Sequence, residues 1–151
     1  MSDLFELQLS LDLPGSLPAS DLALIRRHLG EAGDQALETS DPLPDPLEEY
    51  PLLSSRGPAH RIGGALVGEL LPGPRGWALT VRQEVHPDEF DALRTLLTWL
   101  AIRTTTIGTI GHIRFLESEV PDALIATPEG IHRLPLRPDS PTQHLLPNDE
   151  E

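Results

Sequence analysis

The chain contains no cysteine and no lysine among its 151 residues. Without cysteine, the protein forms no disulfide, no thiolate zinc site and no iron–sulfur cluster, and it has no thiol nucleophile. Without lysine, it has no Schiff-base nucleophile and no lysine for a phosphate-binding loop. All 11 basic residues are therefore arginine. Histidine, the carboxylates, arginine and the hydroxyls remain as the groups available for chemistry.

Aromatic residues and long apolar runs are also scarce. Only 4% of the residues are aromatic, which is too few for a platform that stacks nucleic-acid bases. No apolar run approaches the ~20 residues that cross a bilayer. No secretory apolar segment precedes the first predicted strand. We therefore expect a cytoplasmic protein with no membrane partner.

Negative charge is abundant and unevenly distributed. The net charge is −13, of which residues 1–55 carry −9 and residues 138–151 carry −4, while residues 56–137 are balanced. An acidic surface repels phosphate backbones, so we expect no nucleic-acid partner. The charge serves either solubility or docking of a basic protein partner. The length predicts one domain, residues 1–137, followed by a flexible acidic tail, residues 138–151.

Two segments alternate apolar and polar side chains, which is the pattern of a half-buried strand. They are residues 5–13 and residues 77–85, with Gln83 as the one break on the apolar side. Successive side chains of a strand point to opposite faces, so each segment offers one face to a core and one to water. Strands of a doubly wound parallel sheet would instead be apolar on both faces.

The remaining elements complete an α+β pattern, which we predict to be an antiparallel sheet of five or six strands with two helices on one face. The order is strand, helix, strand, strand, helix, strand, followed by a C-terminal hairpin. Over residues 5–116 this order resembles the ferredoxin-like topology, a fold that implies no function by itself. The other predicted elements are a helix from Ser16 or Ser20 to Gly30, a strand at 62–71, a turn at 72–76, a helix from His86 to Arg103, a strand at 107–116 and a hairpin at 123–134.

A proline-rich acidic segment at about residues 34–59 interrupts this pattern. Its prolines deny the backbone regular donors, and its six acids before Arg56 face no base. We predict an extended loop, and a loop of this length is often either functional or disordered. Tyr50, Leu52 and Leu53 are expected to hold its far end against the body.

The face of the sheet that points away from the helices is the best candidate site. Alternation places both charges, hydroxyls and an imidazole on it, enough for specific hydrogen bonding. Arg82 and Arg114 are expected to be exposed there, free to contact a partner's carboxylates and of little importance for stability. The other readings of this face are a solvated surface with cross-strand ion pairs and a small-ligand or catalytic site. The candidate residues are Glu6, Gln8, Ser10, Asp12, Thr80, Arg82, Glu84, His112 and Arg114.

No catalytic or metal-binding signature stands out. Glu84 and His86 are two residues apart and could act as an acid–base or metal pair, but the six histidines show no spacing typical of metal ligands. The glycine-rich segments lack the spacing of phosphate-binding loops. We therefore predict no catalytic residue, no metal site and no cofactor.

The sequence favours a non-enzymatic protein-interaction module that acts through the polar sheet face and the acidic loop. An immunity or inhibitor protein that neutralises a basic effector fits the small size and the acidity. The alternative is a small-molecule-binding protein or a cofactor-independent enzyme, built as a homodimer around an apolar pocket that holds His86 or His112. A structural subunit of a larger assembly is a third reading.

Overall fold

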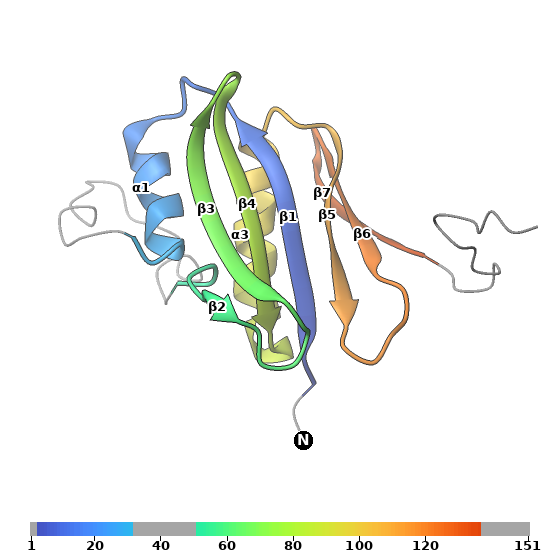
Figure 1. Cartoon of the computed structure of the whole chain (residues 1–151). Helices are drawn as coiled ribbons and strands as arrows, with labels where there is room; N and C mark the ends of the chain where they lie inside the picture. The colour runs from blue at the N-terminus through green and yellow to red at the C-terminus, as the bar shows by residue number, and fades with distance from the viewer. Residues whose placement is uncertain (1–2, 32–50, 137–151) are drawn as a thin grey trace, which may run out of the picture.

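The computed structural model describes residues 3–31 and 51–136, and it shows an antiparallel sheet with two helices (Figure 1). The α+β class is thus confirmed. The helices are α1 (Ala19–His28) and α3 (Phe90–Arg103), the latter preceded by a single 3-10 turn, η2 (Pro87–Glu89). The strands are β1 (Phe5–Leu13), β2 (Gly57–Pro58), β3 (Ala65–Gly73), β4 (Gly76–Val85), β5 (Gly108–Phe115), β6 (Asp122–Thr127) and β7 (Gly130–Pro135).

The sheet has seven strands in the order β2-β3-β4-β1-β5-β6-β7, and every neighbouring pair is antiparallel. It is larger than the five or six strands expected. The added strand is β2, two residues from the predicted loop that pair with β3 at the edge of the sheet. An edge position tolerates a proline such as Pro58, and two residues are too few to show any periodicity in a sequence.

The core lies between one face of the sheet and both helices. The odd-numbered leucines of β1 are buried, with Leu7 and Leu9 at 0% exposure. They belong to one apolar cluster with Ile25 of α1 and with Leu93 and Leu96 of α3. Both helices therefore cover the same face, and the even-numbered residues of β1 belong to the other.

The ends of both helices follow ordinary helix chemistry. Helix α1 has Pro18 at its N-cap and no side-chain cap, so neither Ser16 nor Ser20 plays that role. Arg26 and Arg27 in its last turn suit the negative end of the helix dipole. Within the described residues, neither helix is long and apolar enough to cross a membrane.

Gln83, the break in the alternating pattern, is buried at 2% exposure on the core side of β4. Its amide is fully engaged there. Oε1 accepts the Ser55 N–H at 3.1 Å, and Nε2 donates to the Ser55 and Val67 carbonyls at 3.0 Å each. A buried amide is tolerated because its hydrogen bonds are made, and here it attaches the segment before β2 to the sheet.

The far end of the predicted acidic loop packs against α1. Leu52 and Leu53 are buried, as expected. The Leu52 N–H donates to Nδ1 of His28 at 3.2 Å, and the Leu53 N–H donates to the His28 carbonyl at 2.9 Å. Tyr50, the rest of the predicted loop before it and the predicted tail at 138–151 lie outside the described residues.

Candidate functional site

The nine predicted site residues lie on three neighbouring strands, β4, β1 and β5, at the centre of the sheet. Their strand registers place them on the face that carries no helix, which we call the outer face. The opposed residues include Glu6 with Glu84 and Arg114, Gln8 with Arg82 and His112, and Ser10 with Thr80.

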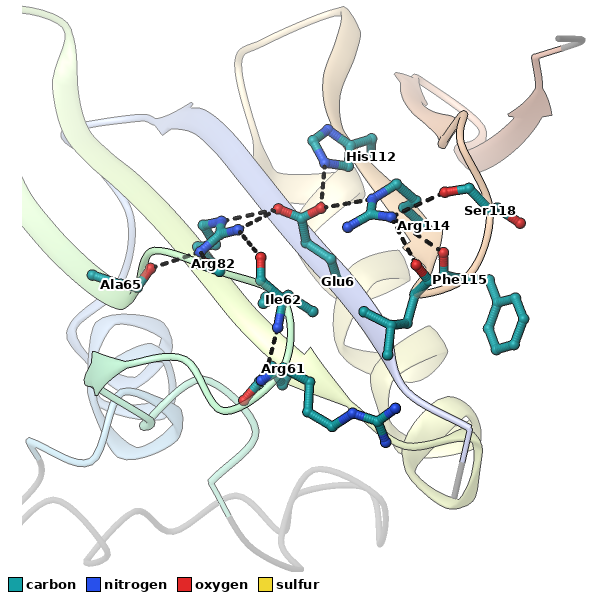
Figure 2. A network of polar contacts seen from close by, with 12 residues as sticks. Glu6, Arg61, Ile62, Ala65, Arg82, His112, Arg114, Phe115 and Ser118 are labelled. Atoms are coloured by element: carbon teal, nitrogen blue, oxygen red, sulfur yellow. Dashed lines mark hydrogen bonds and ion pairs between the residues drawn. The ribbon is translucent and has the colours of Figure 1, made fainter. Parts of the chain in front are cut away.

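The carboxylate of Glu6 lies at the centre of a polar network (Figure 2). Its side chain is only 9% exposed. Nε of Arg82 donates to Oε2 at 2.9 Å and Nε of Arg114 donates to Oε1 at 3.2 Å, while Nε2 of His112 lies 3.6 Å from Oε1. Burial alone would raise the pKa of Glu6, but the bonds from Arg114 and Arg82 outweigh it and hold the pKa below its ordinary value. Glu6 is therefore a charged, internally paired group.

Arg82 is the second fully engaged residue of this network. Nη1 donates to the carbonyls of Gly63 and Ala65 at 2.7 and 3.0 Å. Nη2 donates to the Ile62 carbonyl at 3.3 Å and lies 2.9 Å from the Glu6 carboxylate. A guanidinium has five N–H groups, and the contacts of Nε, Nη1 and Nη2 account for all of them. The expectation that Arg82 is free to contact a partner is therefore wrong, because carbonyls from a distant loop occupy its donors.

That loop, residues 59–64, folds back toward the outer face and is held by Glu84. The Ala59 N–H donates to the Gly64 carbonyl at 2.8 Å, and Gly64 has a φ of +73°, a conformation that favours glycine. The Glu84 carboxylate accepts three successive backbone N–H groups, those of residues 60, 61 and 62, at 3.0, 2.6 and 3.1 Å. Burial would raise the pKa of Glu84, but these bonds, led by that of Arg61, keep it below its ordinary value.

Glu84 is therefore an anchor for the loop. In the part of the chain that the structure describes, no three candidate ligands come together in a way that could hold a metal ion.

Arg114 secures the turn that follows β5. Nη1 donates to the carbonyls of Phe115, Leu116 and Ser118 at 3.5, 3.1 and 3.0 Å. With the bond to Glu6, these contacts give Arg114 a structural role as well. Arg82 and Arg114 thus both bind the Glu6 carboxylate and hold neighbouring backbone carbonyls in place on the outer face.

The other half of the outer face remains accessible. Ser10 and Thr80 are exposed, and the side chains of Gln8, Ser10 and Thr80 make no hydrogen bond to residues 3–31 or 51–136. Asp12 forms an exposed ion pair with Arg75 at 3.4 Å.

Two exposed leucines on the outer face were missed at the sequence level. Leu71 is 55% exposed and pairs with Ala78 of β4, and Leu134 is 52% exposed and pairs with Ala123 of β6. The register Asp12–Ala78 places Leu71 on the outer face. A signal was available for Leu71, because two consecutive leucines in a strand must point to opposite faces.

Residues in the described part of the chain line two pockets beside the sheet. One, of about 190 Å³, lies on the helix side and is mostly apolar. The other, of about 550 Å³, lies at the end of the sheet and has a mixed lining. His86 lines the second pocket, whereas His112 lines neither. The lining of the first is Phe90, Leu93, Arg94, Leu97, Ile113, Leu124, Ile131, His132 and Arg133, and that of the second is Leu4, Ser55, Arg56, Pro58, His60, Arg61, Leu66, Glu84 and His86.

Comparison with models of protein families, with curated proteins and with solved structures gives no match to this chain.

Proposed function

We propose that the protein is a non-enzymatic protein-binding module whose outer face docks a protein partner. The observation that carries this proposal is that both helices cover one face of the sheet, while the other face exposes Leu71 and Leu134 on either side of polar residues that include Ser10, Thr80 and Glu69. Protein interfaces typically combine exposed apolar side chains with polar side chains that form hydrogen bonds to the partner.

The dimensions of the outer face suit a protein interface. At about 4.8 Å between neighbouring strands, the distance from β3 to β7 is about 24 Å. A standard interface covers about 800 Å² on each partner, which corresponds to a patch of similar width. The network around Glu6 keeps the face rigid, so little conformational entropy is lost when a partner binds.

The charge distribution supports a basic partner. Residues 1–55 carry a net charge of −9, and the exposed Glu69 lies opposite Thr80 on the outer face. In this proposal the acidic residues accelerate the encounter with a basic effector, and the outer face provides the contact. An immunity or inhibitor protein works by such an encounter.

We also propose a ferredoxin-like order for the four strands β3, β4, β1 and β5. Their spatial order is β3-β4-β1-β5 and all three neighbouring pairs are antiparallel. Helix α1 lies between β1 and β3 in the chain, and α3 lies between β4 and β5, which supports the split arrangement. It does not bear on the function.

The test is photo-crosslinking from the outer face in cells of the source organism. A photoreactive phenylalanine replaces Ser10 or Thr80 on the outer face, and Ser20 of α1 in a matched control. We expect one heterologous adduct from both outer-face positions and none from Ser20. The double variant Leu71→Glu/Leu134→Glu should abolish the adduct and leave the fold intact, because both leucines are exposed.

Three results would contradict the proposal. The first is no adduct from either outer-face position, and the second is an equal adduct from Ser20. The third is an adduct that survives the double Leu71→Glu/Leu134→Glu variant. An adduct of twice the chain mass would show that the partner is a second copy of the chain and not a basic effector.

A further inference from the structure

The second pocket, which we call the basal pocket, lies where β1 begins and β4 ends, at the lower end of the sheet in Figure 1. Leu4 and Leu66 contribute buried apolar surface to it, at 7% and 6% exposure. The polar walls come from Ser55, Arg56, His60, Arg61, Glu84 and His86. Its volume of about 550 Å³ lies within the range of small-molecule sites, about 300–1,000 Å³.

Positive and titratable groups dominate the polar lining. Arg56, Arg61, His60 and His86 line the pocket, and Glu84 is the one carboxylate among the residues that line it. The charged side chains of this lining are mainly basic, whereas the whole chain has a net charge of −13. The Glu84 carboxylate competes little with a ligand for the donors of the pocket, because three backbone N–H groups already bind it.

The two arginines of the pocket differ in what they bind. Arg56 donates to the carbonyls of Ser54 and Gly68 and lies 3.6 Å from the Glu31 carboxylate, so it is already occupied. The guanidinium of Arg61 has no hydrogen bond or ion pair with the described residues, although its backbone N–H binds Glu84. Figure 2 shows the Arg61 side chain extending away from the network around Glu6. Its five N–H groups are thus available to an external acceptor.

We propose that the basal pocket binds a small molecule that carries a phosphomonoester. The guanidinium of Arg61 binds two phosphate oxygens in parallel, a geometry that arginine adopts with phosphate. The imidazoles of His60 and His86 donate to the phosphate, and Leu4 and Leu66 contact the apolar part of the ligand. A phosphate has three terminal oxygens for these donors, whereas a single carboxylate has two.

This site is independent of the proposed protein-binding function, because the pocket and the accessible half of the outer face share no residue. The probe is phenyl phosphate, which combines a phosphomonoester with an apolar ring. The measurement is a titration of the ¹⁵N-labelled chain followed by the amide resonances. We expect saturable shifts at the amides of residues 60–62 and of Leu66. Crosslinking from Ser10 tests the other proposal separately.

The matched variants are Arg61→Ala and Arg75→Ala. Arg75 lies in the β3–β4 turn with its side chain 81% exposed, and it does not line the pocket. We expect Arg61→Ala to weaken binding at least ~10-fold, a loss of ~1.4 kcal/mol, with the rest of the spectrum unchanged. Arg75→Ala should bind as the unaltered chain does. The double variant His60→Gln/His86→Asn should also weaken binding.

Several outcomes would overturn the proposal. They are the absence of saturable shifts with phenyl phosphate, an unchanged affinity in Arg61→Ala, and an equal loss in Arg75→Ala. Benzoate serves as the carboxylate probe. If benzoate binds as tightly as phenyl phosphate, the pocket does not select a phosphomonoester. Saturable binding of a tetraglutamate peptide without binding of phenyl phosphate would assign the pocket to acidic protein segments instead.

Discussion

Replacing Arg82 with methionine should destabilise the protein far more than the removal of an ordinary surface arginine. Methionine keeps most of the aliphatic length of the side chain and removes all five N–H groups. The substitution leaves Glu6, at 9% side-chain exposure, with Arg114 and His112 as its remaining partners. It also removes the donors that bind the carbonyls of Ile62 and Gly63 in the loop and the carbonyl of Ala65 at the start of β3.

The size of the effect follows from these contacts. Removing one partner of a buried ion pair costs about 3–5 kcal/mol. Arg114 still engages Glu6, which we take to reduce this contribution to about 2 kcal/mol. The bonds to the Gly63 and Ala65 carbonyls are exposed and the bond to the Ile62 carbonyl is partly buried, so water replaces most of what the donor supplied and together they add about 1 kcal/mol. The expected loss is therefore about 3 kcal/mol, or a fall in Tm of about 6–12 °C for a chain of this size.

Urea unfolding at pH 7 measures this loss, with Arg75→Met as the control. Arg75 also pairs with a carboxylate of β1, Asp12 at 3.4 Å, but its side chain is 81% exposed, so its removal should change little. In the double variant Glu6→Gln/Arg82→Met the loss should be smaller than the sum of the two single losses, since the two residues interact directly. A loss in Arg82→Met no larger than in Arg75→Met would refute the view that Arg82 is a structural anchor.

Three further predictions concern stability. The pKa values of Glu6 and Glu84 are held below the ordinary value, so the stability that these two carboxylates contribute is complete above the unfolded pKa of ~4.3 and is lost as the pH falls through the lower folded values. In Glu6→Gln the urea midpoint should therefore fall less steeply below that pH. An unchanged dependence of the urea midpoint on pH in this range would contradict the prediction. His28→Leu removes the acceptor of the buried Leu52 N–H and should cost about 1–3 kcal/mol, whereas His28→Asn, which keeps an acceptor near Nδ1, should cost less in the same assay. A Cβ at position 111 would clash with the backbone oxygen of Gln8, whereas one at position 15 would lie 3.7 Å from its nearest neighbour. Gly111→Ala should therefore lower the Tm markedly and Gly15→Ala should not. Similar melting curves for the two variants would show that β5 can move away from β1.

The sheet and its two faces were predictable because the information for them is local. Alternation in residues 5–13 correctly assigned Leu7, Leu9 and Leu11 to the core, since the two faces of a strand differ in their exposure to water. The proline at position 87 and the apolar spacing after it predicted a helix from His86, and the structure has the 3-10 turn η2 at Pro87–Glu89 followed by α3 from Phe90. Strand β2 was not predictable, because its two residues belong to the sheet only through their pairing with β3.

The chemistry of the outer face was not predictable because its partners are distant in the sequence. Alternation placed Glu6 on that face, and it is indeed there, but its side chain is 9% exposed rather than solvated. The cause is the pairing with Arg82 and Arg114 and the loop that folds over Arg82. Gln83 was likewise visible as a break in the pattern, but its partners at Ser55 and Val67 were not.

The central position of β1 in the sheet has a consequence for how the chain folds. Glu6 is separated by 76 residues from Arg82 and by 108 residues from Arg114, although both are its neighbours in space. During synthesis β1 is made long before β4 and β5, the strands that flank it. Until then its leucines stay exposed and its backbone N–H and C=O groups stay unpaired. Pairings this distant along the chain slow folding, and an unpaired apolar strand is prone to aggregate while it waits. Both edges of β1 are paired only after β5 has been made. The N-terminal strand therefore reaches its native pairing only when the C-terminal half of the chain has been synthesised.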